Sequence, residues 1–320
     1  MKIPFERTLV GAYRFAFTNL LSIFGIAWFP FAIVGCVAVG LFYSLLPVLN
    51  TVFSTTMDKW DETQAVPFLS SMFGALALLI VVVFVAHAMV MVGLMRKALG
   101  QQPEPVYFYF SLGAPVWRMI GAYALLLLLA WGATIAFAVG IGLIVIGFSR
   151  VSQLAQSIVT FVLMVTAIFG GIYAFVRVQF FLPAVVVAER HIGLRRSWNL
   201  GRGNFWRIVG ITILVTLPAY IVFSTCLSIA MQIALAGHTA KLAAFNAHAM
   251  NGSPTPAEMR EYFMTIVAVL KSSWPILVLL ELVYFAALIG LSAGAIATAY
   301  NLVNGQSGDA PVVGAAKAGT

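Results

Sequence analysis

Six long apolar runs constrain this chain more than any other feature of its sequence. They lie at about residues 20–46, 68–95, 119–147, 157–187, 208–236 and 274–302. A helix needs about 20 apolar residues to cross the roughly 30 Å hydrocarbon core of a bilayer, so each run is long enough. The backbone of a helix also satisfies its own hydrogen bonds in lipid. The sequence therefore predicts an all-α integral membrane protein, a bundle of about six transmembrane helices.

The amino-acid composition excludes a soluble globular protein. Of the 320 residues, 62% are hydrophobic and 9% are charged, whereas soluble domains have about 45–50% apolar and about 25% charged residues. So few charges cannot cover the surface of a soluble protein of this size. Cys36 and Cys226 both lie inside apolar runs, so neither a disulfide framework nor a cysteine metal site is expected.

The distribution of Lys and Arg predicts the orientation of the bundle. Of the 18 basic residues, only Lys59, Arg150, Lys241, Arg260 and Lys271 fall on the side opposite the termini. Short loops rich in Lys and Arg stay in the cytoplasm, so we expect both termini there. We expect residues 1–304 to form a single transmembrane domain and residues 305–320, which are small and polar, to form a flexible cytoplasmic tail. Topology alone accounts for the net charge of +8, so nucleic acid is not an expected partner.

A short motif indicates an internal repeat. Trp117 to Gly121 opens the third run and Trp206 to Gly210 opens the fifth, both with the pattern Trp-Arg-x-x-Gly. Gly25 occupies the matching position in the first run. The pattern predicts three units, each an interfacial segment on the cytoplasmic side followed by a helical hairpin. Chance similarity is the alternative, because Trp and Arg both favour the membrane interface.

The segment between the fourth and fifth runs carries the most distinctive residues. It contains a run from Pro183 to Glu189, then Arg196-Ser197-Trp198-Asn199-Leu200, then Gly203-Asn204-Phe205-Trp206-Arg207. This segment resembles the loop of the bacterial membrane domain found in some glycerophosphoryl diester phosphodiesterases and in YciC-like inner-membrane proteins. The resemblance implies a multi-pass protein of the bacterial inner membrane. Since about 17 residues follow the sixth run and a phosphodiesterase barrel needs roughly 200, that activity is not expected.

The same segment is the candidate face for lipid headgroups or a partner protein. Its members are Arg190, Arg195, Arg196, Trp198, Arg202, Asn204, Trp206 and Arg207. Arginines interleaved with aromatic residues are typical of an amphipathic helix lying on anionic headgroups. The N-terminal segment repeats this pattern, with Phe5, Leu9, Tyr13 and Phe17 at four-residue spacing. The alternative is that these residues only fix the topology and anchor the bundle.

Ionisable groups at membrane depth are the second candidate site. If the sixth helix begins at residue 274, Glu281 lies ~12 Å from the outer boundary and His87 ~13 Å from the inner one. The two would then differ in depth by about 5 Å within a roughly 30 Å core and can pair, with Tyr284 as another partner for Glu281. Such a pair would be either a proton- or substrate-sensitive site or a structural contact. Arg177 and Gln179 complete this candidate set, and Arg177 is expected to snorkel or to bind a backbone carbonyl.

Small residues predict close helix packing within the chain. Gly290 and Gly294 form a GxxxG pattern in the sixth run, and Gly132 and Gly140 are similarly spaced in the third. The longest connection, residues 237–272, contains Asn-Gly-Ser-Pro-Thr-Pro at 251–256 and is expected to be a loop.

The sequence contains none of the familiar enzyme motifs, so no catalytic residue, cofactor or metal is expected. We therefore expect a non-enzymatic scaffold or accessory protein that contacts anionic phospholipids, a partner protein or a second copy of itself. The alternative is a transporter or permease-like protein for a small or lipidic substrate, using the buried Glu/His pair.

Overall fold

The computed structural model describes residues 2–54, 62–147, 153–252 and 255–305, and every regular element in these ranges is helical. Six stretches in these ranges are long and apolar enough to cross a membrane, which confirms the predicted multi-pass helical protein. The long helices are α2 (Leu20–Ser54), α3 (Glu62–Ala98), α4 (Ala114–Gly147), α5 (Gln153–Gln179), α8 (Phe205–Leu235) and α10 (Pro256–Val303). The predicted tail beyond residue 305 lies outside the described residues.

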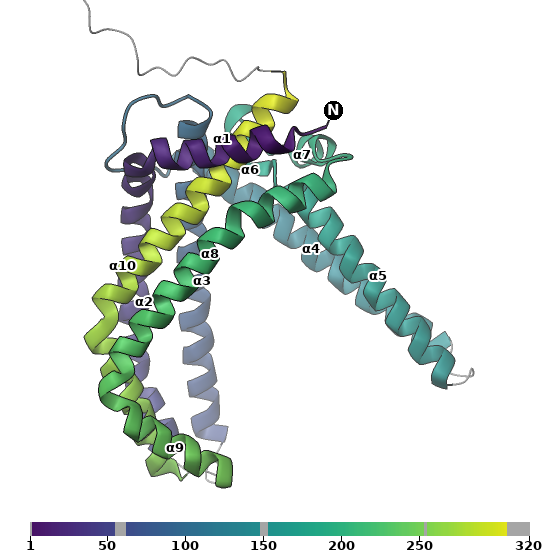
Figure 1. Ribbon diagram of the computed structural model, residues 1–320. Helices are drawn as coiled ribbons and strands as arrows, with labels where there is room; N and C mark the ends of the chain where they lie inside the picture. Colours follow the sequence, from purple (N-terminus) through teal and green to yellow (C-terminus); the bar gives the residue numbers. More distant parts are fainter. Residues whose placement is uncertain (1, 55–61, 148–152, 253–254, 306–320) are drawn as a thin grey trace, which may run out of the picture.

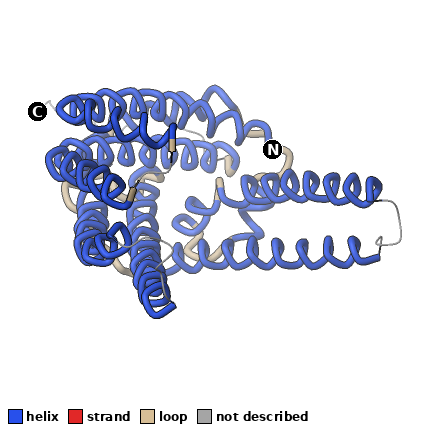
Figure 2. The backbone as a smooth tube through the Cα atoms, turned by 90° about the horizontal axis from the view of Figure 1, so that it is seen from below, coloured by secondary structure: helices blue, strands red, loops and turns tan. Residues whose placement is uncertain are grey.

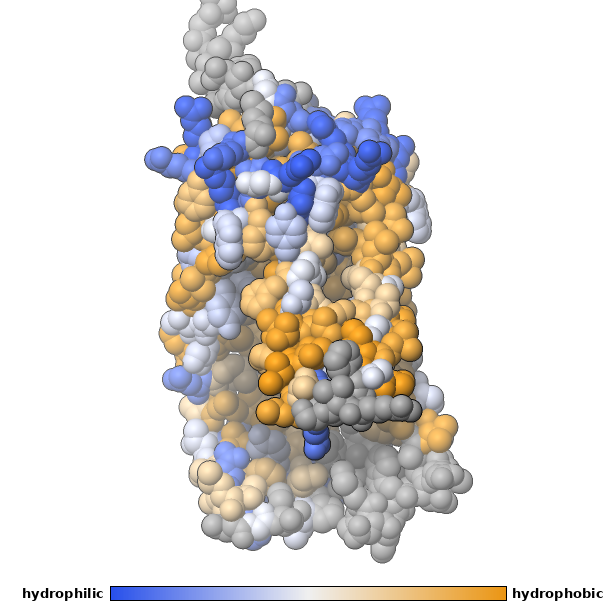
Figure 3. All heavy atoms as spheres, turned by 90° about the vertical axis from the view of Figure 1, so that its right-hand side faces the viewer, coloured by the Kyte–Doolittle hydropathy of each residue, from blue (hydrophilic) through white to orange (hydrophobic). Residues whose placement is uncertain are grey.

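The long helices alternate in direction, so both ends of the described chain lie at one end of the bundle (Figure 1). We call this the basic end and the opposite one the far end. Three shorter helices lie at the basic end, namely α1 (Phe5–Thr18), α6 (Leu182–Ala188) and α7 (Leu194–Leu200). Figure 3 shows a belt of hydrophilic residues around this end above a largely hydrophobic surface. This asymmetry agrees with the uneven distribution of Lys and Arg in the sequence.

The helix α1 crosses the top of the bundle instead of lying free on its surface (Figure 1). Its buried residues are Thr8, Ala12 and Ala16, which follow one another at four-residue spacing. Because these side chains are small, α1 approaches α10 closely: a Cβ on Gly294 would lie 3.0 Å from the carbonyl oxygen of Ala12. The predicted apolar stripe turns partly toward α8, where the hydroxyl of Tyr13 donates to the carbonyl of Leu214 at 2.8 Å.

Gly290 and Gly294 of α10 pack within the chain, whereas Gly132 and Gly140 of α4 do not. A Cβ on Gly290 would lie 2.8 Å from the side chain of Ile23 in α2, but a Cβ on Gly132 or Gly140 would meet no atom within 4 Å. The reason is that the α4–α5 hairpin projects away from the other long helices (Figures 1 and 2). The predicted intramolecular packing is therefore confirmed for α10 and wrong for α4.

The fourth predicted run, 157–187, lies within one candidate span, Gln153–Ala188. The helix is interrupted inside this span, because α5 ends at Gln179 and the separate helix α6 starts at Leu182. Pro183 has no backbone N–H to continue the α5 hydrogen bonds, but it is tolerated in the first turn of a new helix.

The expected loop at 237–272 is mostly helical. It contains the short 3-10 helix η2 (Ala236–His238), then α9 (Thr239–Asn251) and the beginning of α10. Thr255 and Glu258 form a capping box at the start of α10, and such a reciprocal cap satisfies two orphan N–H groups. Thr255 and Pro256 thus lie at the start of a helix, not in the middle of a loop.

The buried core is concentrated at the basic end. The side chains of α6 are buried from Leu182 to Val187, and α3 contributes a buried run from Ala88 to Val92. On α4 the buried residues are Val116, Met119 and Ala122, all near its first turns. The short helix α6 therefore lies at the centre of the basic end and positions the α6–α7 segment above the membrane-spanning helices.

Candidate functional site at the basic end

The chain turns sharply between α6 and α7. Arg190 adopts φ 59°, a left-handed conformation that is uncommon for residues other than glycine. The turn ends at Gly193, where a Cβ would lie 2.3 Å from the side chain of Val185. Residues 189–191 therefore lie outside the helix that contains Leu194 and Trp198, so a single amphipathic helix does not extend through this described segment.

Glu189 ties this turn to the end of α10. Its Oε1 accepts a hydrogen bond from Nε of Arg196 at 3.1 Å and another from the hydroxyl of Tyr300 at 3.0 Å. Arg196 also donates from Nη2 to the side chain of Asn304 at 2.9 Å. Arg196 was expected to face headgroups, but its guanidinium holds α7 against α10. The sequence signal was available, since Glu189 is the only carboxylate among five nearby arginines.

Arg177, near the end of α5, holds α7 in place. Its side chain is buried, and Nε donates to the carbonyl of Trp198 at 3.1 Å while Nη1 donates to the hydroxyl of Tyr173 at 3.0 Å. The guanidinium carbon also lies 4.0 Å from the centre of the Trp198 ring, a cation–π geometry. The predicted bond from Arg177 to a backbone carbonyl is thus confirmed. Gln179, which was predicted to belong to the same candidate site, is exposed.

Asn204 and Arg207 clamp the beginning of the chain. The Oδ1 of Asn204 accepts a hydrogen bond from the backbone N–H of Ile3 at 2.9 Å, and Nη1 of Arg207 donates to the carbonyl of the same residue. Ile3 and Asn204 are both buried. The Gly-Asn-x-Trp-Arg motif, which was predicted to face headgroups, therefore docks the N-terminal segment onto α8 through these two residues.

The side chains of the remaining arginines of the segment are exposed. Arg190, Arg195 and Arg202 are exposed, and no hydrogen bond or ion pair to their side chains occurs in the described ranges. Trp206, which lies beside them in sequence, is 80% exposed. We call these four residues the arginine face. Unpaired cations next to an exposed tryptophan suit the boundary between lipid headgroups and water.

Glu281 and His87 do not form the predicted pair. The ring of His87 packs against Tyr123, with the ring centres 5.8 Å apart, while the Glu281 side chain is exposed on α10. Tyr284 does not satisfy Glu281 either, because it stacks on Phe223 with the ring centres 4.0 Å apart.

The depth estimate for this pair was wrong because it placed both residues in a core of roughly 30 Å. As a helix, the apolar run 274–302 is about 43 Å long, so depth is better counted from the shared basic end. On that count Glu281 lies ~33 Å along α10 from Val303, whereas His87 lies ~16 Å along α3 from Ala98. The two side chains are therefore at different levels of the bundle.

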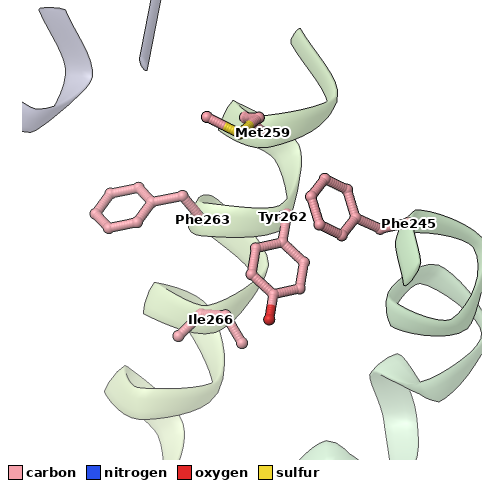
Figure 4. A pocket seen from close by; sticks show the side chains of 5 residues that line it. All are labelled: Phe245, Met259, Tyr262, Phe263 and Ile266. Atoms are coloured by element: carbon pink, nitrogen blue, oxygen red, sulfur yellow. The ribbon is translucent and has the colours of Figure 1, made fainter. Parts of the chain in front are cut away.

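A cavity near the far end is apolar. It has a volume of about 430 Å³ and lies between α9 and α10 (Figure 4). Its lining residues are Phe245, Met259, Tyr262, Phe263 and Ile266. The rings of Phe245 and Tyr262 stack 4.3 Å apart, so their contact joins the two helices. Nowhere in the described ranges do three or more His, Cys, Asp or Glu side chains gather as metal ligands would.

Comparison of the chain with protein-family profiles, curated proteins and solved structures finds no match in any of the three. The resemblance of the α6–α8 segment to the phosphodiesterase membrane domain and to YciC-like proteins therefore stays a prediction from the sequence. The geometry of the basic end is what bears on function.

Replacing Asn204 with alanine is expected to release the N-terminal segment from α8. The N–H of Ile3 would lose its buried acceptor, which costs about 1–3 kcal/mol. Hydrogen exchange of a peptide covering residues 2–9 should then become at least about tenfold faster. Asn199→Ala is the matched control, because Asn199 is exposed on the neighbouring helix α7. Equal exchange rates in the two variants would contradict the clamp.

Proposed function

We propose that this protein is a non-enzymatic, multi-pass scaffold or accessory protein of the bacterial inner membrane. Its arginine face binds anionic phospholipid headgroups on the cytoplasmic side, and both termini lie on that side. The observation that carries the proposal is that Arg190, Arg195 and Arg202 are exposed and unpaired in the described ranges. The neighbouring Arg196 and Arg207 are held by contacts within the chain.

Some arginines of this end make contacts within the chain and others are exposed, and this difference supports a rigid lipid-binding surface. Arg177, Arg196 and Arg207 fix the positions of α7, the α6–α7 turn and the N-terminal segment. The free arginines are therefore presented on an ordered surface, so less conformational freedom is lost when a headgroup binds. Lys2, Arg7 and Arg14 of the N-terminal segment are also exposed at this end, which extends its attraction for an anionic leaflet. Each such residue contributes about 1 kcal/mol near an anionic surface.

The double variant Arg195→Gln, Arg202→Gln tests the proposal. Two lost cations correspond to about 2 kcal/mol, so the affinity for phosphatidylglycerol should fall roughly 30-fold. Native mass spectrometry of the protein in mild detergent, titrated with that lipid, measures the change. The matched control is Arg260→Gln, Lys271→Gln, which removes two exposed charges from α10 toward the far end. Equal losses in both double variants would mean that net charge, not the arginine face, attracts the lipid.

The transporter alternative has lost the feature on which it rested, because Glu281 and His87 occupy different levels and different contacts. The scaffold proposal is therefore the one that the geometry supports.

A further inference from the structure

The segment that connects α3 to α4 runs along the side of α2. Residues 106–112 of this segment are not helical. They begin beside the first turns of α2, where the N–H of Val106 donates to Oγ of Ser22 at 3.3 Å. Farther along α2, the ring of Phe108 lies 4.8 Å from the ring of Phe29, measured between their centres. The segment is therefore held against α2 over the ~10 Å between Ser22 and Phe29.

Aromatic side chains of this segment and of α2 form an exposed group. Tyr107, Phe108 and Phe110 are each more than half exposed, and Trp28 is 40% exposed. The rings of Trp28 and Phe108 lie 5.9 Å apart between their centres. We call these four residues the aromatic cluster. A continuous exposed apolar surface of this kind indicates contact with a membrane or a partner, so water alone is an unfavourable environment for it.

The backbone of the same segment excludes the hydrocarbon core as its environment. Among the described residues, the N–H groups of Phe108, Tyr109 and Phe110 find no acceptor. Each unsatisfied backbone group is costly by several kcal/mol in the bilayer core, where lipid-exposed irregular segments do not occur. The boundary between hydrocarbon and headgroups satisfies both requirements, because it offers oxygen acceptors to the backbone and is the level that Trp and Tyr favour.

The length of α2 agrees with a boundary at this level. From Phe29 to Pro47, the last residue of its candidate span, α2 rises ~27 Å. This rise is close to the thickness of a hydrocarbon core of roughly 30 Å. Counted from Leu20 instead, the same span is ~40 Å long and exceeds the core.

The apolar residues above this level are buried in protein. Every residue of α3 from Ala88 to Met95 is buried, as are most residues of α10 from Ala286 to Tyr300. Phe31 of α2 stacks on Phe285 of α10 with the ring centres 5.4 Å apart, so the buried part of α10 begins near the level of the aromatic cluster. These residues are apolar because they form the core of the basic end, and they need no contact with lipid.

We propose that the aromatic cluster is embedded at the boundary between hydrocarbon and headgroups, in the leaflet at the basic end. Its partner is the ester region of the phospholipids, whatever the charge of their headgroups. The free N–H groups of residues 108–110 donate to ester oxygens, and the rings lie among the first methylenes of the acyl chains. The hydrocarbon core begins below Phe29, so the first turns of α2 lie at the level of the headgroups. This contact is separate from the arginine face and does not depend on it.

The test measures the depth of spin labels on the full-length protein in phosphatidylcholine nanodiscs. Electron paramagnetic resonance detects collisions of a label with oxygen, which concentrates in hydrocarbon, and with a nickel complex, which stays in water. The variants Leu21→Cys, Val39→Cys and Phe108→Cys each carry one label, in a background in which Cys36 and Cys226 are replaced by serine. Leu21, Val39 and Phe108 are all exposed, so a label at these positions disturbs no buried contact.

We expect the label at position 39 to be the deepest, ~15 Å below the label at position 108, because Val39 follows Phe29 by ten residues. The label at position 21 should collide most often with the nickel complex. Replacing phosphatidylcholine with phosphatidylglycerol should change none of these depths, since an aromatic anchor needs no charge. Loss of lipid binding at the arginine face would leave the depths unchanged, so the two proposals can fail separately.

Three results would overturn the proposal. If the hydrocarbon core began at Leu20, position 108 would be the deepest of the three, ~14 Å below the boundary, and position 39 would lie near the far boundary. If the aromatic cluster faced water, the label at position 108 would meet the nickel complex as often as the label at position 21. The third test places benzoylphenylalanine at position 108, where one ring replaces another. Irradiation should crosslink it to phospholipid, and a crosslink to a second copy of the chain would identify a protein contact instead.

Discussion

Replacing Gly25 with alanine is expected to destabilise the protein by about 3 kcal/mol or more. A Cβ at this position of α2 would lie 2.0 Å from the carbonyl oxygen of Val106 and 2.7 Å from Cα of Tyr107. Both are backbone atoms, so no side-chain rotation relieves the clash, and overpacking of even flexible cores costs about 1–3 kcal/mol. The midpoint of thermal unfolding in mild detergent measures the effect.

The clash at Gly25 would also displace the segment that connects α3 to α4. This segment is held on α2 by a hydrogen bond from Nε1 of Trp28 to the carbonyl of Tyr107 at 3.1 Å. A second bond runs from the N–H of Val106 to Oγ of Ser22 at 3.3 Å. Gly35→Ala and Gly40→Ala are matched controls on the same helix, because a Cβ there meets no atom within 4 Å. Alanine should leave stability unchanged or raise it by up to about 1 kcal/mol. Similar losses in all three variants would contradict the explanation.

The three glycines of the predicted repeat make equivalent contacts. A Cβ on Gly25 would meet the segment before α4. A Cβ on Gly121 would lie 3.3 Å from Ile192, which precedes α7. A Cβ on Gly210 would lie 3.0 Å from the ring of Phe5 in α1. Each glycine therefore faces the interfacial segment of the next unit, and the third faces that of the first. This cyclic order supports the repeat as a proposal. The segment before α4 is not helical, unlike α1 and α7, so the units differ in detail.

The sequence predicted the six spans because hydrophobic length is a local property. Each run long enough to cross the hydrocarbon lies in a helical stretch of the described chain, although the fourth is divided between α5 and α6. The sequence did not predict where helices end, because the ends depend on single residues. Pro183 lies in the first turn of α6, which starts a new helix inside the predicted span, and the Thr255–Glu258 capping box starts α10 well before the apolar run. The pairing of Glu281 with His87 was wrong for another reason, because both depths were counted within a core of roughly 30 Å, whereas the apolar run of α10 is about 43 Å long as a helix.

The sequence grouped the candidate residues at the basic end but did not distinguish their individual contacts. Composition shows that arginines gather there, but only the fold distinguishes Arg196, which reaches Asn304 across 108 positions of sequence, from Arg195, which is free. The clamp of Asn204 on Ile3 spans 201 positions. Contacts between such distant residues have no local signal in one sequence, so the arginine face could be defined only after the internal partners were known.

Replacing Arg177 with alanine is expected to cost about 3–5 kcal/mol and to release α7 from the bundle. The change removes two hydrogen bonds from a charged donor, each contributing about 1.5–3 kcal/mol at most, and a cation–π contact of up to about 2 kcal/mol. It also leaves a cavity, since Gly201 packs directly on the Arg177 backbone and side chain. Thermal unfolding in mild detergent measures the loss, and quenching of tryptophan fluorescence reports the exposure of Trp198.

Two further variants separate the packing of Arg177 from its charge. Arg177→Lys keeps the positive charge but cannot reproduce the planar fork that bonds Trp198 and Tyr173 while stacking on the indole. Its stability should fall between that of the wild type and that of Arg177→Ala. Arg202→Ala, which removes an exposed arginine, should change stability by less than about 0.5 kcal/mol. Since α7 carries Arg195, Arg177→Ala should also weaken phosphatidylglycerol binding, although Arg177 is buried and cannot reach a headgroup. A lysine variant as stable as the wild type would show that charge alone, and not this geometry, holds the arginine face in place.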